Sequence, residues 1–227
     1  MSDLATRLAD VRHGIREAAQ AAGRDAEDLT LIVVTKFHPA SLVRELAALG
    51  VRDVGENRHQ EAQSKAAELA GLDLRWHFIG QLQTKKARQA AQYAHAIHSI
   101  DRECLVDALS TAQVERPVEA FVQVNLTDDP GRGGASPDEI ERIAERVLET
   151  PVLRLRGVMA VAPLPEEEPA ASAFERLRGY AERVRALDPR ATGISAGMTH
   201  DYAEAIAAGA THLRIGTAIT GERPLGR

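Results

Sequence analysis

The sequence contains a single cysteine, Cys104, and this scarcity excludes two kinds of protein. One thiol cannot build an internal disulfide framework, and it cannot supply a multi-cysteine metal site. Cys104 lies in a helical pattern over residues 101–112, where we expect a buried or half-buried thiol. We predict no metal site, because no other histidine, aspartate or glutamate stands at metal-ligand spacing from His77.

The chain also lacks a long apolar run and an excess of positive charge. No stretch approaches the roughly 20 apolar residues that cross a bilayer, and the N-terminus carries charges where a signal peptide needs an apolar run. Lysine and arginine total 28 against 33 aspartates and glutamates, so the net charge of -5 argues against a broad nucleic-acid surface. We therefore expect a cytoplasmic enzyme or small-molecule binder, with neither a membrane nor a nucleic-acid partner.

The composition is that of a chain with a full hydrophobic core. Hydrophobic residues make up 44% of the 227 residues and charged residues 27%, which indicates one compact domain over residues 1–227. The apolar pattern alternates between helical periodicity and short β-branched runs. We expect eight strands, at residues 29–35, 51–54, 75–79, 96–99, 118–124, 155–159, 192–195 and 212–215.

Eight βα units with short connections favour a (β/α)8 barrel, and an apolar stripe predicts an extra helix before the first strand. An open doubly wound sheet is the alternative. It would be supported by a glycine-rich turn after the first strand, but residues 35–39 contain no glycine. The segments 131–134 and 163–169 are interpreted as flexible loops. Asp201 and Glu204 have capping-box spacing before a helix that Gly209 ends.

Lys36 is the sharpest candidate for chemistry. Side chains alternate along a strand, so Ile32, Val34 and Lys36 share one face. If the first two point into the barrel, Lys36 points there too, and an amine beside an apolar wall loses hydration. The neutral amine can then attack an aldehyde, as a Schiff base requires. A lysine that reaches the surface from a strand end is the alternative, and it is favoured while this residue is considered alone.

The last two βα units have the chemistry of a phosphate site. Barrels often bind phosphate with the loops after strands seven and eight, through backbone N–H groups and small hydroxylated residues. The segments that carry this chemistry contain Ser195, Gly197, Thr199, Gly216 and Thr217. Each segment alone is equally well interpreted as an ordinary cap or turn. Together with a lysine across the barrel mouth, they indicate a phosphate-bearing aldehyde as the ligand.

Two further polar features favour structural interpretations. His77 stands between apolar neighbours, and such a residue is more often a hydrogen-bonded core histidine than a catalyst. Lys85, Lys86 and Arg88 could form a local basic patch, although a solvated helix face is the better interpretation.

Ordered motifs run along the whole chain. They are LIVVTK at 31–36, GEN at 55–57 with Gln60 and Glu61, WHFIG at 76–80 with Leu82, Gln83 and Lys86, GVM at 157–159, SAGMTHD at 195–201, and RIGT at 214–217 with GER at 221–223. In this order and spacing the sequence resembles the pyridoxal 5'-phosphate homeostasis protein family. The combination is far more specific than any one motif.

The resemblance implies a single-domain (β/α)8 barrel, related to the N-terminal domain of alanine racemase, that carries pyridoxal 5'-phosphate. Lys36 stands at the family's Schiff-base position, and Arg214 matches the arginine near the pyridine nitrogen. The residues that match the phosphate-binding segments are Ser195, Thr199, Gly216 and Thr217, with Gly197 between the first two. The positions expected to line the cofactor pocket are Asn57, His77 and Met159.

Four positions depart from the pattern expected of this family. Ala196 stands where Met is common, Thr199 where Ser is common, Arg58 where Tyr is common, and Lys85 where Asn is common. Thr199 keeps a hydroxyl group, so phosphate binding should survive. Arg58 and Lys85 leave open what besides the cofactor occupies the barrel mouth.

A carrier and an amino-acid racemase are both compatible with this resemblance. An arginine at the pyridine nitrogen keeps that nitrogen unprotonated, which weakens the ring as an electron sink. Racemases of this fold compensate with two bases, one of them a tyrosine from a second domain of a partner subunit. The sequence ends at Arg227, and its tyrosines, Tyr93, Tyr180 and Tyr202, fall in helical segments. We therefore expect a non-catalytic carrier that affects amino-acid metabolism.

The expected partners are the cofactor and the apoenzymes that depend on it. A monomer is expected, because no second domain is available to be shared between subunits. A sugar-phosphate isomerase barrel is a third interpretation, which keeps the phosphate site but gives Lys36 no covalent role.

Overall fold

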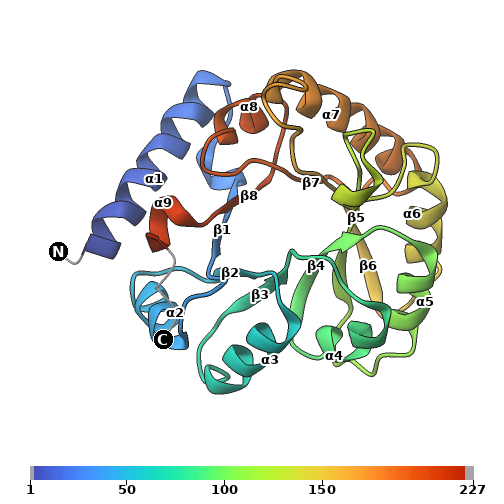
Figure 1. Cartoon of the computed structure of the whole chain (residues 1–227), viewed down its shortest axis with the longest axis horizontal. Coiled ribbons are helices and arrows are strands. Elements are labelled where there is room, and N and C mark those ends of the chain that lie inside the picture. The colour runs from blue at the N-terminus through green and yellow to red at the C-terminus, as the bar shows by residue number, and fades with distance from the viewer. Residues whose placement is uncertain (1–2, 223–227) are drawn as a thin grey trace.

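The computed structural model describes residues 3–222, which form a closed barrel of parallel strands (Figure 1). In order around the barrel the strands are β1 (Thr30–Val34), β2 (Asp53–Glu56), β3 (Arg75–Phe78), β4 (Ala94–Ile100), β5 (Val118–Gln123), β6 (Leu153–Met159), β7 (Gly193–Ser195) and β8 (His212–Ile215). β1 pairs with β8 to close the barrel, with Ile32 opposite Arg214. The expected (β/α)8 barrel is confirmed, and each of the eight expected strands overlaps an observed one.

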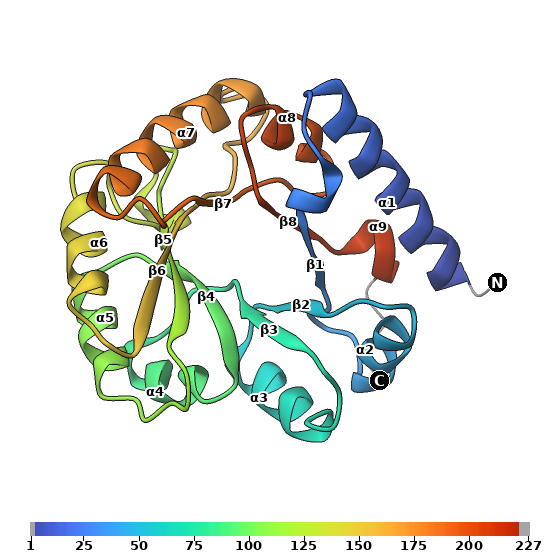
Figure 2. The same cartoon turned by 180° about the vertical axis from the view of Figure 1, so that it is seen from behind.

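The helices form a ring around the strands (Figures 1 and 2). They are α1 (Asp3–Ala21), α2 (Ala40–Ala48), α3 (His59–Glu68), α4 (Ala87–Ala91), α5 (Glu103–Ser110), α6 (Ile140–Leu148), α7 (Ala170–Leu187), α8 (Tyr202–Ala207) and α9 (Thr217–Thr220). The extra helix expected before the first strand is α1, which packs on α8 and α9. Because the barrel is parallel, the loops that follow the strands all lie at one end, the mouth.

Side-chain alternation along the strands separates two regions of the core. Val33 and Val54 belong to the large apolar cluster between the barrel and the helices. Ala96, Phe121 and Met159 form a second, separate cluster of buried residues inside the barrel. The interior of this barrel is only partly apolar, because buried histidine, serine and arginine side chains share it with that second cluster.

Strands β6 and β7 approach each other at two glycines. Gly157 and Gly193 are paired across the two strands. Gly157 has a φ of +146°, and a Cβ atom there would lie 1.8 Å from the carbonyl oxygen of Gly193. A Cβ on Gly193 would lie 2.8 Å from Cε1 of Phe121. The two strands can therefore pair in this register only because neither residue has a side chain.

We expect Gly157→Ala to lower the free energy of unfolding by about 2–3 kcal/mol, because the backbone conformation is strained for an L-residue and the methyl group meets main-chain atoms. Urea unfolding followed by circular dichroism measures the change. Gly179→Ala is the matched control, since a Cβ at Gly179 in α7 meets nothing within 4 Å. The control should be neutral or stabilise by up to about 1 kcal/mol. Equal stabilities for the two variants would contradict the close approach.

Two local expectations are wrong. Cys104 is exposed on α5, because it lies on the solvent side of that helix while Leu105 faces the core. Asp201 precedes α8 but makes no capping bond to the helix. Its Oδ1 instead accepts a hydrogen bond of 2.5 Å from the backbone N–H of Met198, inside the loop after β7. Gly209, at a φ of +99°, follows α8 as expected.

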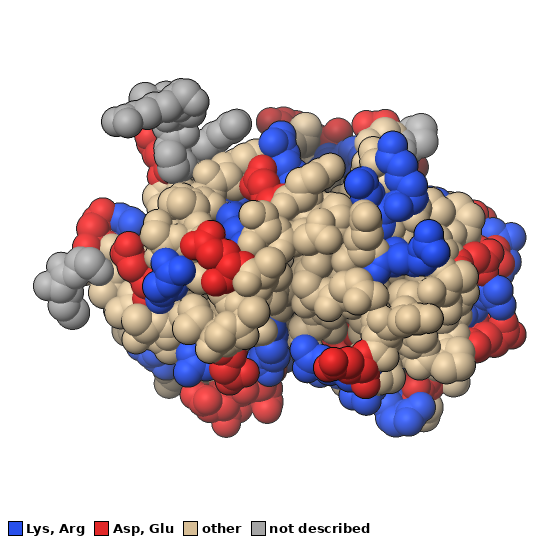
Figure 3. Space-filling model, turned by 90° about the horizontal axis from the view of Figure 1, so that it is seen from below, with Lys and Arg blue, Asp and Glu red and all other residues tan. Residues whose placement is uncertain are grey.

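The surface carries charges of both signs. On the face in Figure 3, acidic and basic side chains are interspersed around uncharged surface. This mixed surface agrees with a net charge of only -5 over the whole sequence. Over residues 3–222, no helix is both long enough and apolar enough to span a membrane.

Candidate functional site at the barrel mouth

Lys36 lies at the mouth, in the turn that follows β1. The preceding residues alternate as expected. The side chains of Ile32 and Val34 lie on one face of β1, since a Cβ atom placed on Gly55 would meet both of them. The Thr35 hydroxyl lies on the opposite face, where it is hydrogen-bonded to Glu56. The Lys36 side chain, however, is exposed. The desolvation expected for an amine inside the barrel is therefore not found, and the amine is open to a ligand arriving from solvent.

A buried ion pair anchors the residue before Lys36. Nζ of Lys65 lies 2.6 Å from Oε1 of Glu56 and donates a 2.9 Å hydrogen bond to the carbonyl oxygen of Thr35. The Thr35 hydroxyl donates to the same carboxylate oxygen at 2.6 Å. Burial raises the pKa of Glu56, and the hydrogen bonds from Lys65 and Thr35 oppose that rise. The second carboxylate oxygen, Oε2, is buried with no hydrogen-bond partner in the described part of the chain.

The residue after Lys36 adopts an unusual backbone conformation. Phe37 has a φ of +67°, which is rare for a bulky residue, and its backbone N–H donates to Oε2 of Glu61 at 3.2 Å. The guanidinium of Arg58 lies 5.0 Å from the centre of the Phe37 ring, and Nζ of Lys36 lies 5.9 Å from it. Arg58, one of the departures from the family pattern, thus places a second cation beside the same ring.

Arg214 is the buried cation of the mouth. Its Nη1 donates to Oγ of Ser195 at 2.6 Å, and its Nη2 donates to the carbonyl oxygen of Ala160 at 2.8 Å. Burial lowers its pKa to about 10, against an opposing attraction from Asp201. The guanidinium is therefore still protonated at neutral pH. Three strands thus contribute to this contact: Ala160 follows the last residue of β6, Ser195 ends β7, and Arg214 is the third residue of β8.

The segments expected to hold phosphate follow β7 and β8. Gly197 is buried at a φ of +91°, and a Cβ there would lie 2.8 Å from Cβ of Ala205, so the loop passes close to α8. Gly216 precedes α9, and a Cβ there would lie 3.3 Å from Cβ of Val34 on β1. Thr199 is half-buried, whereas Thr217 is exposed. The backbone after β8 therefore packs against the strand that leads to Lys36.

The two other residues expected to line the pocket differ in their surroundings. Asn57, in the loop after β2, is half-buried, and its Oδ1 is buried without a hydrogen-bond partner among residues 3–222. Met159 is the last residue of β6 and is buried beside Phe121 and Ala96 in the barrel interior.

His77 is a hydrogen-bonded core histidine, as its apolar neighbours indicated. Its Nε2 lies 2.8 Å from Oδ1 of Asp53, and its Nδ1 lies 2.9 Å from Nε2 of His98. Nδ1 of His98 lies in turn 2.8 Å from Oγ of Ser195. His77 is therefore connected to the Arg214 contact through a second histidine. Sequence reasoning missed His98, although it shares the strand face of inward-facing Ala96, and the alternation argument used for Lys36 could have found it.

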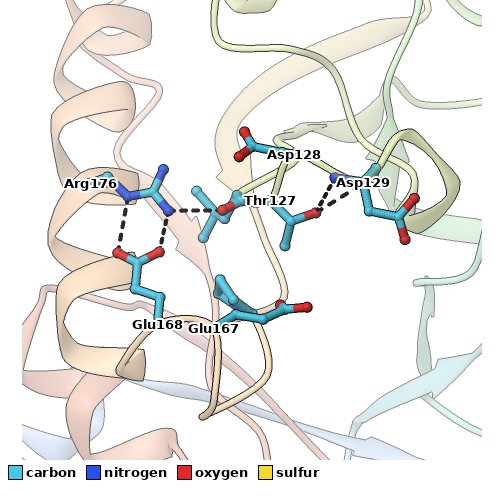
Figure 4. Close-up of a pocket in the computed structure, with 8 residues that line it drawn as sticks. Thr127, Asp128, Asp129, Glu167, Glu168 and Arg176 are labelled. Carbon is cyan, nitrogen blue, oxygen red and sulfur yellow. Dashed lines mark hydrogen bonds and ion pairs between the residues drawn. The ribbon is translucent and has the colours of Figure 1, made fainter.

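A separate cavity of about 520 Å³ lies between the loops after β5 and β6 (Figure 4). Arg176 of α7 borders it, pairing with Glu168 and donating to the carbonyl oxygen of Leu126 at 2.8 Å. None of the site residues expected from the sequence lines this cavity. The two segments interpreted as flexible loops meet nearby, because Arg132 pairs with Glu167 at 3.3 Å.

The groups at the mouth fit a phosphorylated pyridine aldehyde. An accessible amine at Lys36 can react with an aldehyde, and the buried guanidinium of Arg214 can face a ring nitrogen. The unpartnered Oδ1 of Asn57 is a buried acceptor with room for a further donor. A side chain at position 216 would occupy the space beside Val34, and the glycine leaves that space open. Over residues 3–222, no group of three His, Cys, Asp or Glu side chains is arranged to hold a metal ion.

Comparison with known proteins defines the class first. The family model of the alanine racemase N-terminal domain matches residues 6–224. An alanine racemase of Corynebacterium glutamicum shares the fold, with a TM-score of 0.71 at 15% identity over 92% of this chain and 59% of that one. This similarity concerns the fold alone.

Full-length similarity then defines the family. The pyridoxal phosphate homeostasis protein of Pseudomonas aeruginosa is 44% identical over 100% of this chain and 98% of its own, and that of Escherichia coli K12 is 40% identical over 98% of each. PipY of Synechococcus elongatus PCC7942, whose structure has PLP bound, is 34% identical with a TM-score of 0.81, covering 96% of this chain and 100% of that one. The chain belongs to the pyridoxal phosphate homeostasis protein family.

Proposed function

We propose that this protein holds pyridoxal 5'-phosphate at the barrel mouth as a Schiff base with Lys36. It keeps the cofactor available in the cytoplasm rather than using it in catalysis, and through this homeostasis it affects amino-acid metabolism. The observation that carries the proposal is the buried Arg214 guanidinium, held by Ser195 at the same mouth as the exposed amine of Lys36. The PLP-bound structure of PipY, at 34% identity, supports the choice of ligand.

Lys36 and Arg214 hold the two ends of the ring system. Nζ of Lys36 adds to the aldehyde carbon and a water molecule leaves, so the link forms without any other reactant and reverses by hydrolysis. Arg214 donates to the pyridine nitrogen and, as a cation at neutral pH, keeps that nitrogen unprotonated. When bound, the cofactor supplies an electron sink, and an unprotonated ring is a weak one.

The loops after β7 and β8 bind the phosphate group in this proposal. Gly197 and Gly216 bring backbone N–H groups close to the ligand, and the hydroxyls of Thr199 and Thr217 can donate to phosphate oxygens. Asn57 and Met159 then line the remaining sides of the ring, where a half-buried amide and a buried thioether suit a flat aromatic ligand.

The positions of the tyrosines favour a carrier over a racemase. Tyr180 lies on α7 beside Arg183, and the hydroxyl of Tyr93, the residue before β4, lies 3.4 Å from Nδ1 of His59 on α3. Tyr202 begins α8, but its hydroxyl points at α1, 2.4 Å from where a Cβ of Gly14 would lie. None of the three is placed as a second base across from Lys36. Relatives of the same length carry the name of homeostasis proteins, which agrees with this interpretation.

The partners proposed are the cofactor and the apoenzymes that receive it. The exposed turn at Lys36 gives the link access to water, which reversible release requires. A monomer suffices, because the groups assigned to the cofactor come from β1, β2, β6, β7 and β8 of one chain and the loops that follow them.

Absorbance, followed by borohydride reduction and peptide mapping of the purified protein, tests this function. We expect a visible absorbance band after incubation with pyridoxal 5'-phosphate and a reduced adduct on the peptide that contains Lys36. A colourless protein that cannot be reconstituted would contradict the proposal. The absence of an adduct on Lys36 would contradict it too, and is the result that the isomerase interpretation predicts. Sustained conversion of L-alanine to the D-isomer, lost in Lys36→Ala, would assign a racemase instead.

A further inference from the structure

A continuous series of buried side chains crosses the barrel interior from its N-terminal end to the mouth. Asp53 is the first residue of β2, whereas Ser195 is the last residue of β7. The contacts between them measure 2.8 Å from Asp53 to His77, 2.9 Å from His77 to His98, and 2.8 Å from His98 to Ser195. Arg214 then donates to Ser195 at 2.6 Å. Four consecutive short contacts thus join a carboxylate at one end of the barrel to the buried guanidinium at the other.

The two ends of this hydrogen-bond chain fix the direction of its first and last hydrogen bonds. A guanidinium can only donate, so Ser195 Oγ accepts from Arg214. An ionised carboxylate can only accept. Burial alone would raise the pKa of Asp53, but the hydrogen bonds from His77 and Arg75 outweigh it and hold that pKa below its usual value. Burial, together with the charges on neighbouring groups, lowers the pKa of His98 well below 6.5, so this imidazole is neutral at neutral pH.

If each imidazole carries a single proton, one arrangement satisfies all contacts. His77 donates from Nε2 to Asp53 and therefore accepts at Nδ1. His98 donates from Nε2 to His77 and accepts at Nδ1. The hydroxyl of Ser195 then has to donate to His98, which turns its lone pairs toward Arg214. In that arrangement both histidines are the Nε2–H tautomer, and every donor points toward the N-terminal end of the barrel.

Aromatic contacts keep the middle of the chain in place. The ring of Phe121 stacks on His98 with centroids 4.3 Å apart and planes 13° from parallel. His212 meets the edge of Phe121 at 5.0 Å, and its Nδ1 is engaged with the Thr211 hydroxyl at 2.7 Å. The His98 ring is thus fixed in the plane that lets its two nitrogens face His77 and Ser195.

We propose that Asp53, His77 and His98 are positioning residues for Arg214, acting through the hydroxyl of Ser195. Over the described range 3–222, Arg214 has no carboxylate within ion-pair distance, so its nearest fixed acceptors are Ser195 and the Ala160 carbonyl. The hydrogen-bond chain has the negative charge of Asp53 at its far end, and this charge polarises the Ser195 hydroxyl so that its oxygen is a better acceptor for the guanidinium. This inference rests on the proposed function, in which Arg214 contacts the pyridine nitrogen.

Two substitutions of His77 separate hydrogen bonding from simple volume. Gln can accept from His98 through Oε1 and donate to Asp53 through its amide nitrogen, so His77→Gln keeps the chain and its direction. His77→Leu offers neither group and leaves buried atoms of Asp53 and His98 without a partner. His95→Gln is the matched control, because the His95 ring centroid lies 5.6 Å from that of His77 but His95 makes none of the hydrogen bonds in this series.

We expect His77→Leu to weaken affinity for pyridoxal 5'-phosphate by about tenfold and to shift the absorbance maximum of the bound cofactor, because the group at its ring nitrogen moves. His77→Gln and His95→Gln should stay within about twofold of wild type at an unchanged maximum. Asp53→Asn, which keeps an acceptor but removes the charge, should shift the maximum as well. It also provides a test if His77→Leu does not fold, which thermal unfolding reports.

The outcomes distinguish this inference from the proposed function. A wild-type protein that neither binds the cofactor nor yields a Lys36 adduct overturns the proposed function and the inference with it. If wild type binds, but His77→Leu and Asp53→Asn match its affinity and absorbance maximum, only the positioning role is overturned. Equal losses in His77→Gln and His77→Leu would also overturn it, because the directed hydrogen bonds would then not be the cause.

Discussion

Lys36→Ala is expected to abolish covalent capture of pyridoxal 5'-phosphate. The variant has no amine that can add to the aldehyde carbon at the end of β1, so no reduced adduct should form on the peptide over residues 31–36. The fold should be unaffected, because the Lys36 side chain is exposed and supports no core contact. Borohydride reduction followed by mass spectrometry measures the loss, and the phosphate site alone should retain weak, non-covalent binding.

Lys85→Ala is the matched control for that experiment. Lys85 is also exposed and lies in the short turn after β3, so it reports on non-specific reaction of the aldehyde with surface amines. Adduct formation in this variant should equal that of wild type. A wild-type amount of adduct in Lys36→Ala, mapped to another lysine, would show that the turn after β1 is not the site of attachment.

Periodicity in the sequence was enough to predict the barrel and the place of Lys36. The strands are short apolar runs separated by helical stripes, and this alternation determines which residues lie at the mouth once the sheet is parallel. The same reasoning correctly gave Ile32 and Val34 the opposite face from Thr35. It did not predict that Lys36 is exposed, because the strand ends at Val34 and the turn that follows obeys no two-residue period.

The buried polar groups could not be predicted because their partners are distant in sequence. Glu56 and Lys65 are separated by nine positions, and His98 and Ser195 by 97. A single sequence contains no signal for such pairings, since each residue also has an ordinary surface interpretation. Lys65 illustrates this best: a lysine in a polar helix is expected in solvent, yet its side chain is only 9% exposed.

Lys65→Met is expected to lower the free energy of unfolding by about 3–5 kcal/mol, because it leaves the buried Glu56 carboxylate without its cation. It also removes the hydrogen bond to the Thr35 carbonyl that anchors the residue before Lys36. Urea unfolding measures the first effect, and the rate of adduct formation at Lys36 should fall with the second. Arg44→Met is the control, since Arg44 pairs with Glu68 at 3.3 Å with both side chains 55% exposed. Its cost should stay below about 1 kcal/mol.

The pKa of Glu56 determines how the stability lost in Lys65→Met depends on pH. Burial raises that pKa above its ordinary 4.5 in the folded protein, and removing Lys65 takes away the largest opposing contact. A carboxyl with a raised folded pKa favours the native state below about pH 4.5, and this contribution is lost as the pH rises through the folded value. The stability deficit of Lys65→Met relative to wild type should therefore shrink as the pH is lowered from 8 toward 5.

Adding Glu56→Gln to Lys65→Met should recover stability at pH 8, because the buried charge is then absent. A deficit independent of pH, and not relieved by Glu56→Gln, would mean that lost packing of the lysine stem rather than the stranded carboxylate destabilises the barrel.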